Sequence, residues 1–263
     1  EMNDFAPEIR NAAWWASDTR RAVNGYANEV ILTKQGKMAP PDLSQNEAVQ
    51  MGHVMEPVIG RLAQDKLGVE LTKIDEYKTH PKEQWLRSHF DFAGKQDGKT
   101  ILVECKNYNA SVRSKFDAET GVIPSADMAQ LIHEATVFGV EKVYLAVLFG
   151  GQEFFLASFD ISQQQKDELI KTMAEVWARV QTNSPLPPES TEQVKLMYPV
   201  SEAQTKIASA SVEEASKMLA LIKKEIKALE EREEQYQTLI QGYMGERDTL
   251  MTIDGTVLAT WKS

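Results

Sequence analysis

The segment that decides the fold is an apolar, β-prone run carrying two charged side chains, Thr100-Ile101-Leu102-Val103-Glu104-Cys105-Lys106. Glu104 and Lys106 are two residues apart, so on a strand both side chains project from the same face. Asp91 precedes them across the turn Lys95-Gln96-Asp97-Gly98, and we expect it near the end of the adjacent strand. Buried charges are costly unless they are paired or bind a metal, so this grouping predicts a functional site.

These residues suit metal-assisted hydrolysis of a phosphodiester. Two neighbouring carboxylates repel each other, and a hard divalent ion such as Mg²⁺ relieves that repulsion with oxygen ligands. The backbone carbonyl of Cys105 is well placed to add another oxygen, and Lys106 would orient or help deprotonate an attacking water. Standing alone, the pattern also fits a surface strand with a Glu–Lys pair, so the nuclease interpretation needs support from the rest of the chain.

Two further residues support it. Glu56 lies among mostly apolar or small residues of a predicted helix, where a carboxylate facing the sheet would be a third metal-site acid. Gln130 lies near the start of the helix that follows the motif strand, where its amide would hold the attacking water or a phosphate oxygen. The alternatives are a solvent-facing Glu56 on an amphipathic helix and an ordinary polar helix position for Gln130.

The segments around the motif predict an α/β protein of the α+β type, with a mixed central sheet flanked by helices. A capping box formed by Ser44 and Glu47 is expected to open a helix that stops at Gly68. Further helices are predicted around residues 18–34, 126–138 and 163–182, and strands around residues 69–77, 85–92, 100–105, 142–149 and 153–159.

A Pro/Ser-rich segment divides the chain. We predict a body over residues 1–184, a linker over 185–200 and a C-terminal helical segment over 201–263. The last segment carries a coiled-coil-like heptad seam, interrupted by Glu233, and then an Asp-Gly signal for a small terminal hairpin. Its helix would pack on the body, self-associate or bind a partner protein.

Composition limits the class of protein. The chain has 263 residues, 42% of them hydrophobic and 26% charged, which excludes a largely disordered, collagenous or membrane-embedded protein. A single cysteine, Cys105, excludes a disulfide framework within the chain and favours a reducing cytoplasm. The net charge of −10 by itself disfavours a nucleic-acid partner, yet acidic residues are also what holds divalent metals against a phosphate backbone.

The order Glu56, Asp91, Glu104-Cys105-Lys106, Gln130 resembles the PD-(D/E)xK nuclease fold, and within it the YqaJ-type viral recombinase (phage lambda exonuclease) family. The segments Ala48-Val49-Gln50-Met51-Gly52-His53-Val54-Met55-Glu56 and Asp127-Met128-Ala129-Gln130 are similar to two helices of that family. One departure is Phe92, which follows Asp91 where the family usually has glycine.

The resemblance implies a restriction-endonuclease-like core and a two-metal Mg²⁺ site, at which Mn²⁺ would substitute. Asp91 would be shared by both ions, Glu104 and the Cys105 carbonyl would complete the tighter site, and Glu56 would serve the weaker one. Lys106 would position the water with help from Gln130.

The resemblance also implies a substrate and partners. The chain would digest the 5′-ended strand of linear double-stranded DNA in phage or prophage recombination, as a ring-shaped homo-oligomer such as a trimer, in the host bacterial cytoplasm, beside a single-strand annealing protein. Arg10 and Ser17 would bind the 5′-phosphate.

Arg113 and Lys115, on the loop after the motif strand, are further DNA-binding candidates, although a surface loop would carry similar residues. The alternatives for function are an endonuclease or structure-specific nuclease on the same fold, and a non-catalytic scaffold that acts through the heptad segment.

Overall fold

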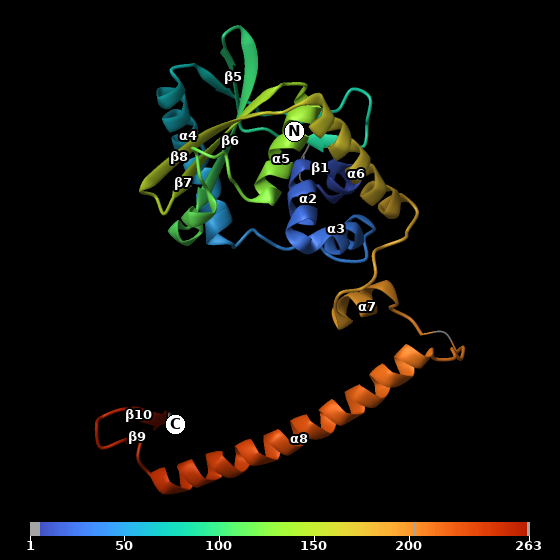
Figure 1. Ribbon diagram of the computed structural model, residues 1–263, viewed down its shortest axis with the longest axis vertical. Coiled ribbons are helices and arrows are strands. Elements are labelled where there is room, and N and C mark those ends of the chain that lie inside the picture. Colours follow the sequence, from blue (N-terminus) through green and yellow to red (C-terminus); the bar gives the residue numbers. More distant parts are fainter. Residues whose placement is uncertain (1–5, 202, 262–263) are drawn as a thin grey trace. The chain divides into compact units, whose positions relative to one another are not determined.

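A computed structural model describes residues 6–201 and 203–261 of the chain (Figure 1). The chain divides into two compact units, of which the first ends at Val200 and the second begins at Ser201. Across the described residues, no helix is both long enough and apolar enough to cross a membrane.

A five-stranded sheet forms the centre of the first unit, with strand order β2-β5-β6-β7-β8. The strands are β2 (Leu71–Lys73), β5 (Phe92–Gln96), β6 (Lys99–Tyr108), β7 (Lys142–Phe149) and β8 (Glu153–Asp160). Strands β6 and β7 are parallel and the other pairs are antiparallel, which confirms the predicted mixed sheet. Asp97 and Gly98 join β5 to β6 with positive φ angles at both residues, as a tight hairpin turn requires.

Helices cover both faces of this sheet (Figure 1). Helix α4 (Glu47–Leu67) packs Ile59 and Ala63 against Val103 of β6, whereas α5 (Ser125–Phe138) shares a core with Leu102 on the opposite face. Side chains alternate along a strand, so Glu104 lies on the α5 face together with Leu102. The predicted helix over 126–138 thus lies over the motif strand.

Further elements, most of them shorter, complete this part of the first unit. They are α1 (Pro7–Asn11), β1 (Trp14–Trp15), α2 (Ala16–Arg21), η1 (Ala22–Tyr26), α3 (Ala27–Lys34), β3 (Lys78–Thr79), β4 (Leu86–Ser88), η2 (Ala110–Lys115) and α6 (Gln163–Gln181). Strands β1, β4 and β3 form a separate small sheet. The single strand predicted over residues 85–92 is therefore wrong: Leu86–Ser88 pairs with β1 and β3, and the chain changes sheet before Phe92 pairs with β6.

Two other boundaries differ from the sequence prediction. Asn46, not Ser44, caps α4, because its side chain directly precedes the helix and accepts a hydrogen bond from the Val49 N–H at 3.2 Å. The segment predicted as a linker, 185–200, contains helix α7 (Thr191–Met197). Its buried Gln193 accepts a hydrogen bond from Asn28 of α3 at 2.8 Å, so this segment packs on the first unit.

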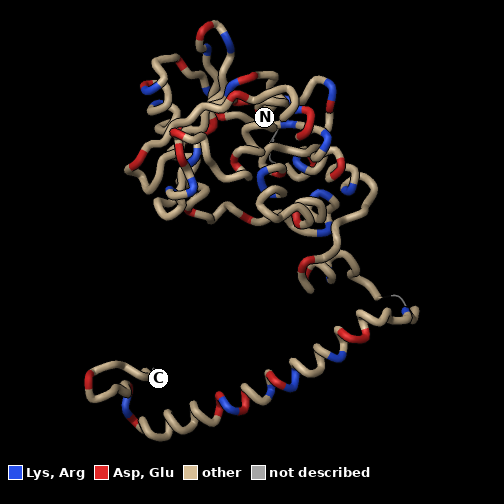
Figure 2. The backbone as a smooth tube through the Cα atoms, viewed as in Figure 1, with Lys and Arg blue, Asp and Glu red and all other residues tan. Residues whose placement is uncertain are grey.

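The second unit contains the predicted long helix and small hairpin. They are α8 (Ala210–Met244), β9 (Thr249–Met251) and β10 (Val257–Thr260), and the two strands are antiparallel. Figure 2 shows charged residues of both signs along α8.

Candidate active site

Asp91 lies immediately before β5, where its side chain extends the sheet. The last backbone pair between β5 and β6 joins Phe92 to Val103, and beyond it Asp91 Oδ2 accepts a hydrogen bond from the Cys105 N–H at 2.7 Å. Because the N–H and C=O of one strand residue point to the same side, the Cys105 carbonyl also faces the side of Asp91. The carboxylate and the carbonyl therefore place two oxygen atoms close together at one end of the strand.

One oxygen of the Glu104 carboxylate contacts both a lysine and a glutamine side chain. Glu104 Oε1 lies 2.6 Å from Lys106 Nζ and 2.7 Å from Gln130 Nε2. Burial alone would lower the pKa of Lys106, but Glu104, Tyr108 and Asp91 outweigh burial and raise it. Lys106 is therefore a cation held beside two carboxylates, as the motif predicts.

A third buried carboxylate, Glu134, was missed by the sequence analysis. Gln130 donates to Glu134 Oε1 at 2.8 Å as well as to Glu104, and Glu134 is 2% exposed. Burial, followed by the charge of Glu104, raises the pKa of Glu134 well above its usual range, and the same two causes raise the pKa of Asp91. Glu134 lies one helical turn after Gln130, so helical spacing was the available signal.

Glu56 faces the same cavity from α4. The cavity has a volume of about 740 Å³, and its lining includes Glu56, Asp91, Glu104 and Gln130. Glu56 Oε1 forms an ion pair with Lys73 Nζ of β2 at 3.0 Å, and this Lys also lines the cavity. The four residues predicted from separate helices and strands thus surround a single space.

Arg10 and Ser17 enter this cavity from the N-terminal layer. Arg10 Nη2 donates to Ser17 Oγ at 2.8 Å, and the guanidinium lies over the Trp15 ring, 4.6 Å from its centroid. Lys34, another residue not anticipated, pairs with Asp18 at 2.7 Å and donates to the Arg10 carbonyl at 2.7 Å. This buried lysine fixes the backbone from which the Arg10 side chain extends.

A polar network joins α2, α5 and β6 behind the site. Arg20 Nε lies 2.8 Å from Asp127 Oδ1, and the Tyr108 hydroxyl donates to the same oxygen at 2.7 Å. Burial raises the pKa of Tyr108 to about 12, so the phenol remains a hydrogen-bond donor at neutral pH. The network holds Asp127 at the start of the helix that carries Gln130.

Arg113 and Lys115 lie on η2 and are absent from the lining of this cavity. Arg113 pairs with Glu153 at 2.5 Å and donates to the Phe116 carbonyl at 2.7 Å, so its guanidinium is engaged within the fold. Their contact with DNA stays a prediction.

The donor set fits a hard divalent cation. Within residues 6–201 and 203–261, no three His, Cys, Asp or Glu side chains are already arranged as a metal cage, and Glu56 and Glu104 pair with lysines. The available donors are nevertheless oxygens, as Mg²⁺ requires. Burial, followed by the charge of Glu104, raises the pKa of Asp91, and a bound cation would favour its ionised form.

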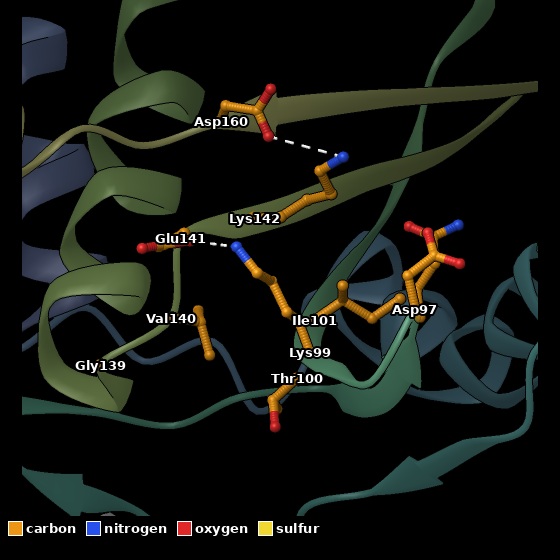
Figure 3. Close-up of a pocket in the computed structure, with 10 residues that line it drawn as sticks. Asp97, Lys99, Thr100, Ile101, Gly139, Val140, Glu141, Lys142 and Asp160 are labelled. Carbon is orange, nitrogen blue, oxygen red and sulfur yellow. Dashed lines mark hydrogen bonds and ion pairs between the residues drawn. The ribbon is translucent and has the colours of Figure 1, made fainter.

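Another cavity, of about 500 Å³, lies at the opposite end of β6 (Figure 3). Figure 3 shows two ion pairs at its rim, Lys99 with Glu141 at 3.0 Å and Lys142 with Asp160 at 3.5 Å. The Lys99–Glu141 pair is largely exposed, and the cavity shares no residue with the candidate active site. We assign it no role in the chemistry.

A mixed sheet with Asp91 just before β5 and Glu104-Cys105-Lys106 on the adjoining strand β6 defines a protein of the PD-(D/E)xK fold class. Residues 8–141 match the family model for the YqaJ-like viral recombinase domain, and the chain belongs to that family.

One relative is the uncharacterized protein YqaJ of Bacillus subtilis (strain 168), 25% identical over 269 residues, which cover 94% of this chain and 82% of the relative. Among solved structures, LHK-Exo in complex with dAMP is similar in fold, with a TM-score of 0.52 and 16% identity over 71% of this chain and 93% of the other. A second structure of LHK-Exo, described as an alkaline exonuclease from Laribacter hongkongensis, has 15% identity and a TM-score of 0.49 over 67% of this chain and 93% of the other. The likeness to LHK-Exo shows that the two proteins share a fold.

Proposed function

We propose that this chain is a Mg²⁺-dependent DNA exonuclease of phage or prophage recombination, which digests the 5′-ended strand of linear duplex DNA and leaves 3′ overhangs. The observation that carries the proposal is the hydrogen-bonded pair of Arg10 and Ser17 on the wall of the cavity that also contains Asp91 and Glu104. A guanidinium matches the oxygens of a phosphate, and this one lines the same cavity as the acids. Such an arrangement favours a terminal phosphate bound next to the bond that is cut.

The residues divide the chemistry as follows. Asp91 would be shared by two Mg²⁺ ions, with Glu104 and the Cys105 carbonyl completing the tighter site and Glu56 serving the weaker one. Mn²⁺ would be a substitute. Bound there, the metal supplies polarisation of the scissile phosphate and lowers the pKa of a bound water. Lys106 keeps its positive charge beside Glu104, so it orients the attacking water and offsets charge on the phosphate. Gln130 donates to both Glu104 and Glu134 and lines the same cavity, so it fixes the Glu104 carboxylate there.

The test uses linear duplex DNA labelled separately at its 5′ and 3′ ends, with Mg²⁺, Mn²⁺ or EDTA, beside a closed circle. We expect shortening from 5′ ends with either metal, none with EDTA, and an intact circle. Lys106→Ala should lose cleavage by orders of magnitude. Cutting of the circle would instead indicate an endonuclease, and no metal-dependent cutting of either DNA would refute the enzyme and favour a scaffold.

The 5′-phosphate site has its own test. Arg10→Ala should lower the rate on 5′-phosphate ends by about 10- to 100-fold, the value of one or two hydrogen bonds to a charged group, and affect 5′-hydroxyl ends much less. Arg61→Ala is the matched control, because Arg61 is an exposed arginine of α4 that pairs with Asp65 of the same helix. An equal loss on both kinds of end would contradict the assignment of Arg10.

We also propose the partners that follow from this activity. A ring of copies of the first unit, such as a trimer, would retain the duplex between cuts, and a single-strand annealing protein would receive the 3′ overhang. Arg113 and Lys115 would contact backbone phosphates outside the cavity. The reaction would take place in the cytoplasm of the bacterial host. Light scattering of the full chain, with and without DNA, tests the ring.

A further inference from the structure

We propose that α8 pairs with α8 of a second copy of this chain as an antiparallel coiled coil in one particular register. The starting observation is an apolar seam that is open to solvent: Ile222, Ile226 and Leu229 are 45%, 48% and 59% exposed. A helix of 35 residues is about 52 Å long, and the hairpin strands of the second unit have only three and four residues. Long helices gain most of their stability from packing of an apolar face, so this seam requires a partner.

The heptad positions of the seam are set by alternating steps of three and four residues. One set of core positions (a) contains Val212, Leu219, Ile226, Glu233 and Ile240, and the other (d) contains Ala215, Ile222, Leu229, Tyr236 and Tyr243. In a parallel pair, Glu233 would face Glu233 of the second copy inside the seam, and Glu225 would flank Glu230. Both are contacts between like charges, so the sequence disfavours the parallel arrangement.

The antiparallel arrangement reverses these signs. When the two helices overlap along their whole length, Ile226 of one copy packs opposite Leu229 of the other. Glu225 then flanks Arg232 of the second copy, and Lys223 flanks Glu230 of the second copy. Two-fold symmetry forms each of these pairs twice.

Glu233 also finds a partner in this arrangement. Its core position lies opposite Ile222 of the second copy, next to Lys223 of that copy. The one acidic residue in the apolar seam is therefore placed beside a cation of the other helix, where its charge is compensated.

The same charges exclude the neighbouring registers. Sliding one helix by a heptad in one direction sets Lys223 against Lys223 of the second copy, and Glu225 against Glu225. Sliding it in the other direction sets Glu230 against Glu230, and Arg232 against Arg232. Only the register with full overlap pairs every flanking charge with its opposite, so charge complementarity identifies a second copy of this chain as the partner.

Disulfide trapping in the full chain tests orientation and register. Cys105 is the only cysteine in the sequence and is buried, so any disulfide between chains would come from the cysteine introduced on α8. Leu219→Cys and Tyr236→Cys, co-expressed with tags of different size and oxidised, should give a cross-linked mixed dimer, because these positions face each other. Leu219→Cys by itself should cross-link little. The introduced cysteine faces position 236 of the second copy, and position 219 of that copy lies about 17 residues, or about 25 Å, further along the helix.

Efficient cross-linking of Leu219→Cys with itself would overturn the proposal in favour of a parallel pair. Cross-linking in neither case would also overturn it and indicate that α8 packs on its own first unit or on another protein. A ring formed by the first units would not mimic the result, because only the cysteines of α8 report.

Charge-reversal substitutions on α8 give a second test. The quantity measured is the dissociation constant for self-association of the full chain, by sedimentation. Glu230→Lys should weaken self-association about tenfold, since it sets Lys against Lys223 of the second copy twice over, and Lys223→Glu/Glu230→Lys together should restore it. Lys227→Glu, on the outer face of the heptad, is the matched control and should change little. Stronger or unchanged association of Glu230→Lys would overturn the antiparallel pairing.

Discussion

Protonation of one buried histidine is expected to limit the stability of this protein in mild acid. His133 of α5 is fully buried, and its Nε2 lies 2.9 Å from the Arg87 carbonyl. A carbonyl only accepts, so Nε2 carries the proton, and Nδ1 accepts from the Thr19 hydroxyl at 2.8 Å. That hydroxyl in turn accepts from the Trp14 indole N–H at 2.9 Å. The chain of hydrogen bonds is complete only when His133 is neutral.

The magnitude follows from the pKa. Burial lowers the pKa of His133 from 6.5 to about 3, although the Arg87 carbonyl opposes the change. Because the folded pKa lies below the unfolded one, the contribution of His133 to stability is complete above pH 6.5 and is lost as the pH falls toward 3. At about pH 5, roughly 1.5 pH units below the unfolded pKa, the loss amounts to about 2 kcal/mol.

The assay compares urea unfolding of the natural chain and His133→Gln, followed by tryptophan fluorescence at about pH 7.5 and about pH 5. The variant keeps a donor for the Arg87 carbonyl but cannot titrate. The pKa values of Asp91 and Glu134 are raised, so these residues change the pH dependence of the unfolding free energy in the opposite direction, and they do so in both chains. The difference between the two pH dependences therefore isolates the contribution of His133. Identical pH dependences of the two unfolding free energies would refute the reasoning.

Two further predictions concern the elements that position the site. Lys34→Met should cost about 3–5 kcal/mol in urea unfolding, because it leaves Asp18 buried without its partner, and a loss below about 1 kcal/mol would contradict this pairing. Gly60→Ala should cost about 1–3 kcal/mol, because the added Cβ would lie 2.5 Å from the Phe92 ring, whereas Gly52→Ala of the same helix meets no atom within 4 Å and should stabilise the protein by about 0.5–1 kcal/mol. Thermal unfolding of the two alanine variants checks the opposite signs, and equal shifts of the melting temperature would show that α4 does not press on β5.

The parts of the fold that were predicted correctly are those with local signals. Gly68 and Gly139 end α4 and α5 in the left-handed conformation, and Asp97-Gly98 closes the hairpin before the motif strand. The strand over residues 85–92 was predicted wrongly because the partner of Leu86–Ser88 is Trp14–Trp15, about 70 residues earlier in the chain. Hydrophobic pattern identifies a strand but does not identify the strand beside it.

The residues of the candidate site also fall into those with a local sequence signal and those without one. Asp91, Glu104 and Lys106 were candidates because charged residues in or near an apolar strand are unusual, and the other candidate residues along the chain supported them. Glu134 and Lys34 were missed because acidic and basic residues on helices usually face solvent, and only packing reveals that these two are buried. Their burial depends on contacts between elements that are distant in the sequence.

The hydrogen bond from the Cys105 N–H to Asp91 affects how relatives are to be interpreted. Since the carboxylate stands where a backbone acceptor would continue the sheet, folding alone is a reason to retain it. A relative that had lost cleavage would still keep an aspartate here for folding. Lys106 makes no such hydrogen bond to the backbone of the sheet, so it could be replaced. Under the proposed function, persistence of the lysine would be the better mark of retained cleavage, and Lys106 would be a better position than Asp91 for an inactive variant.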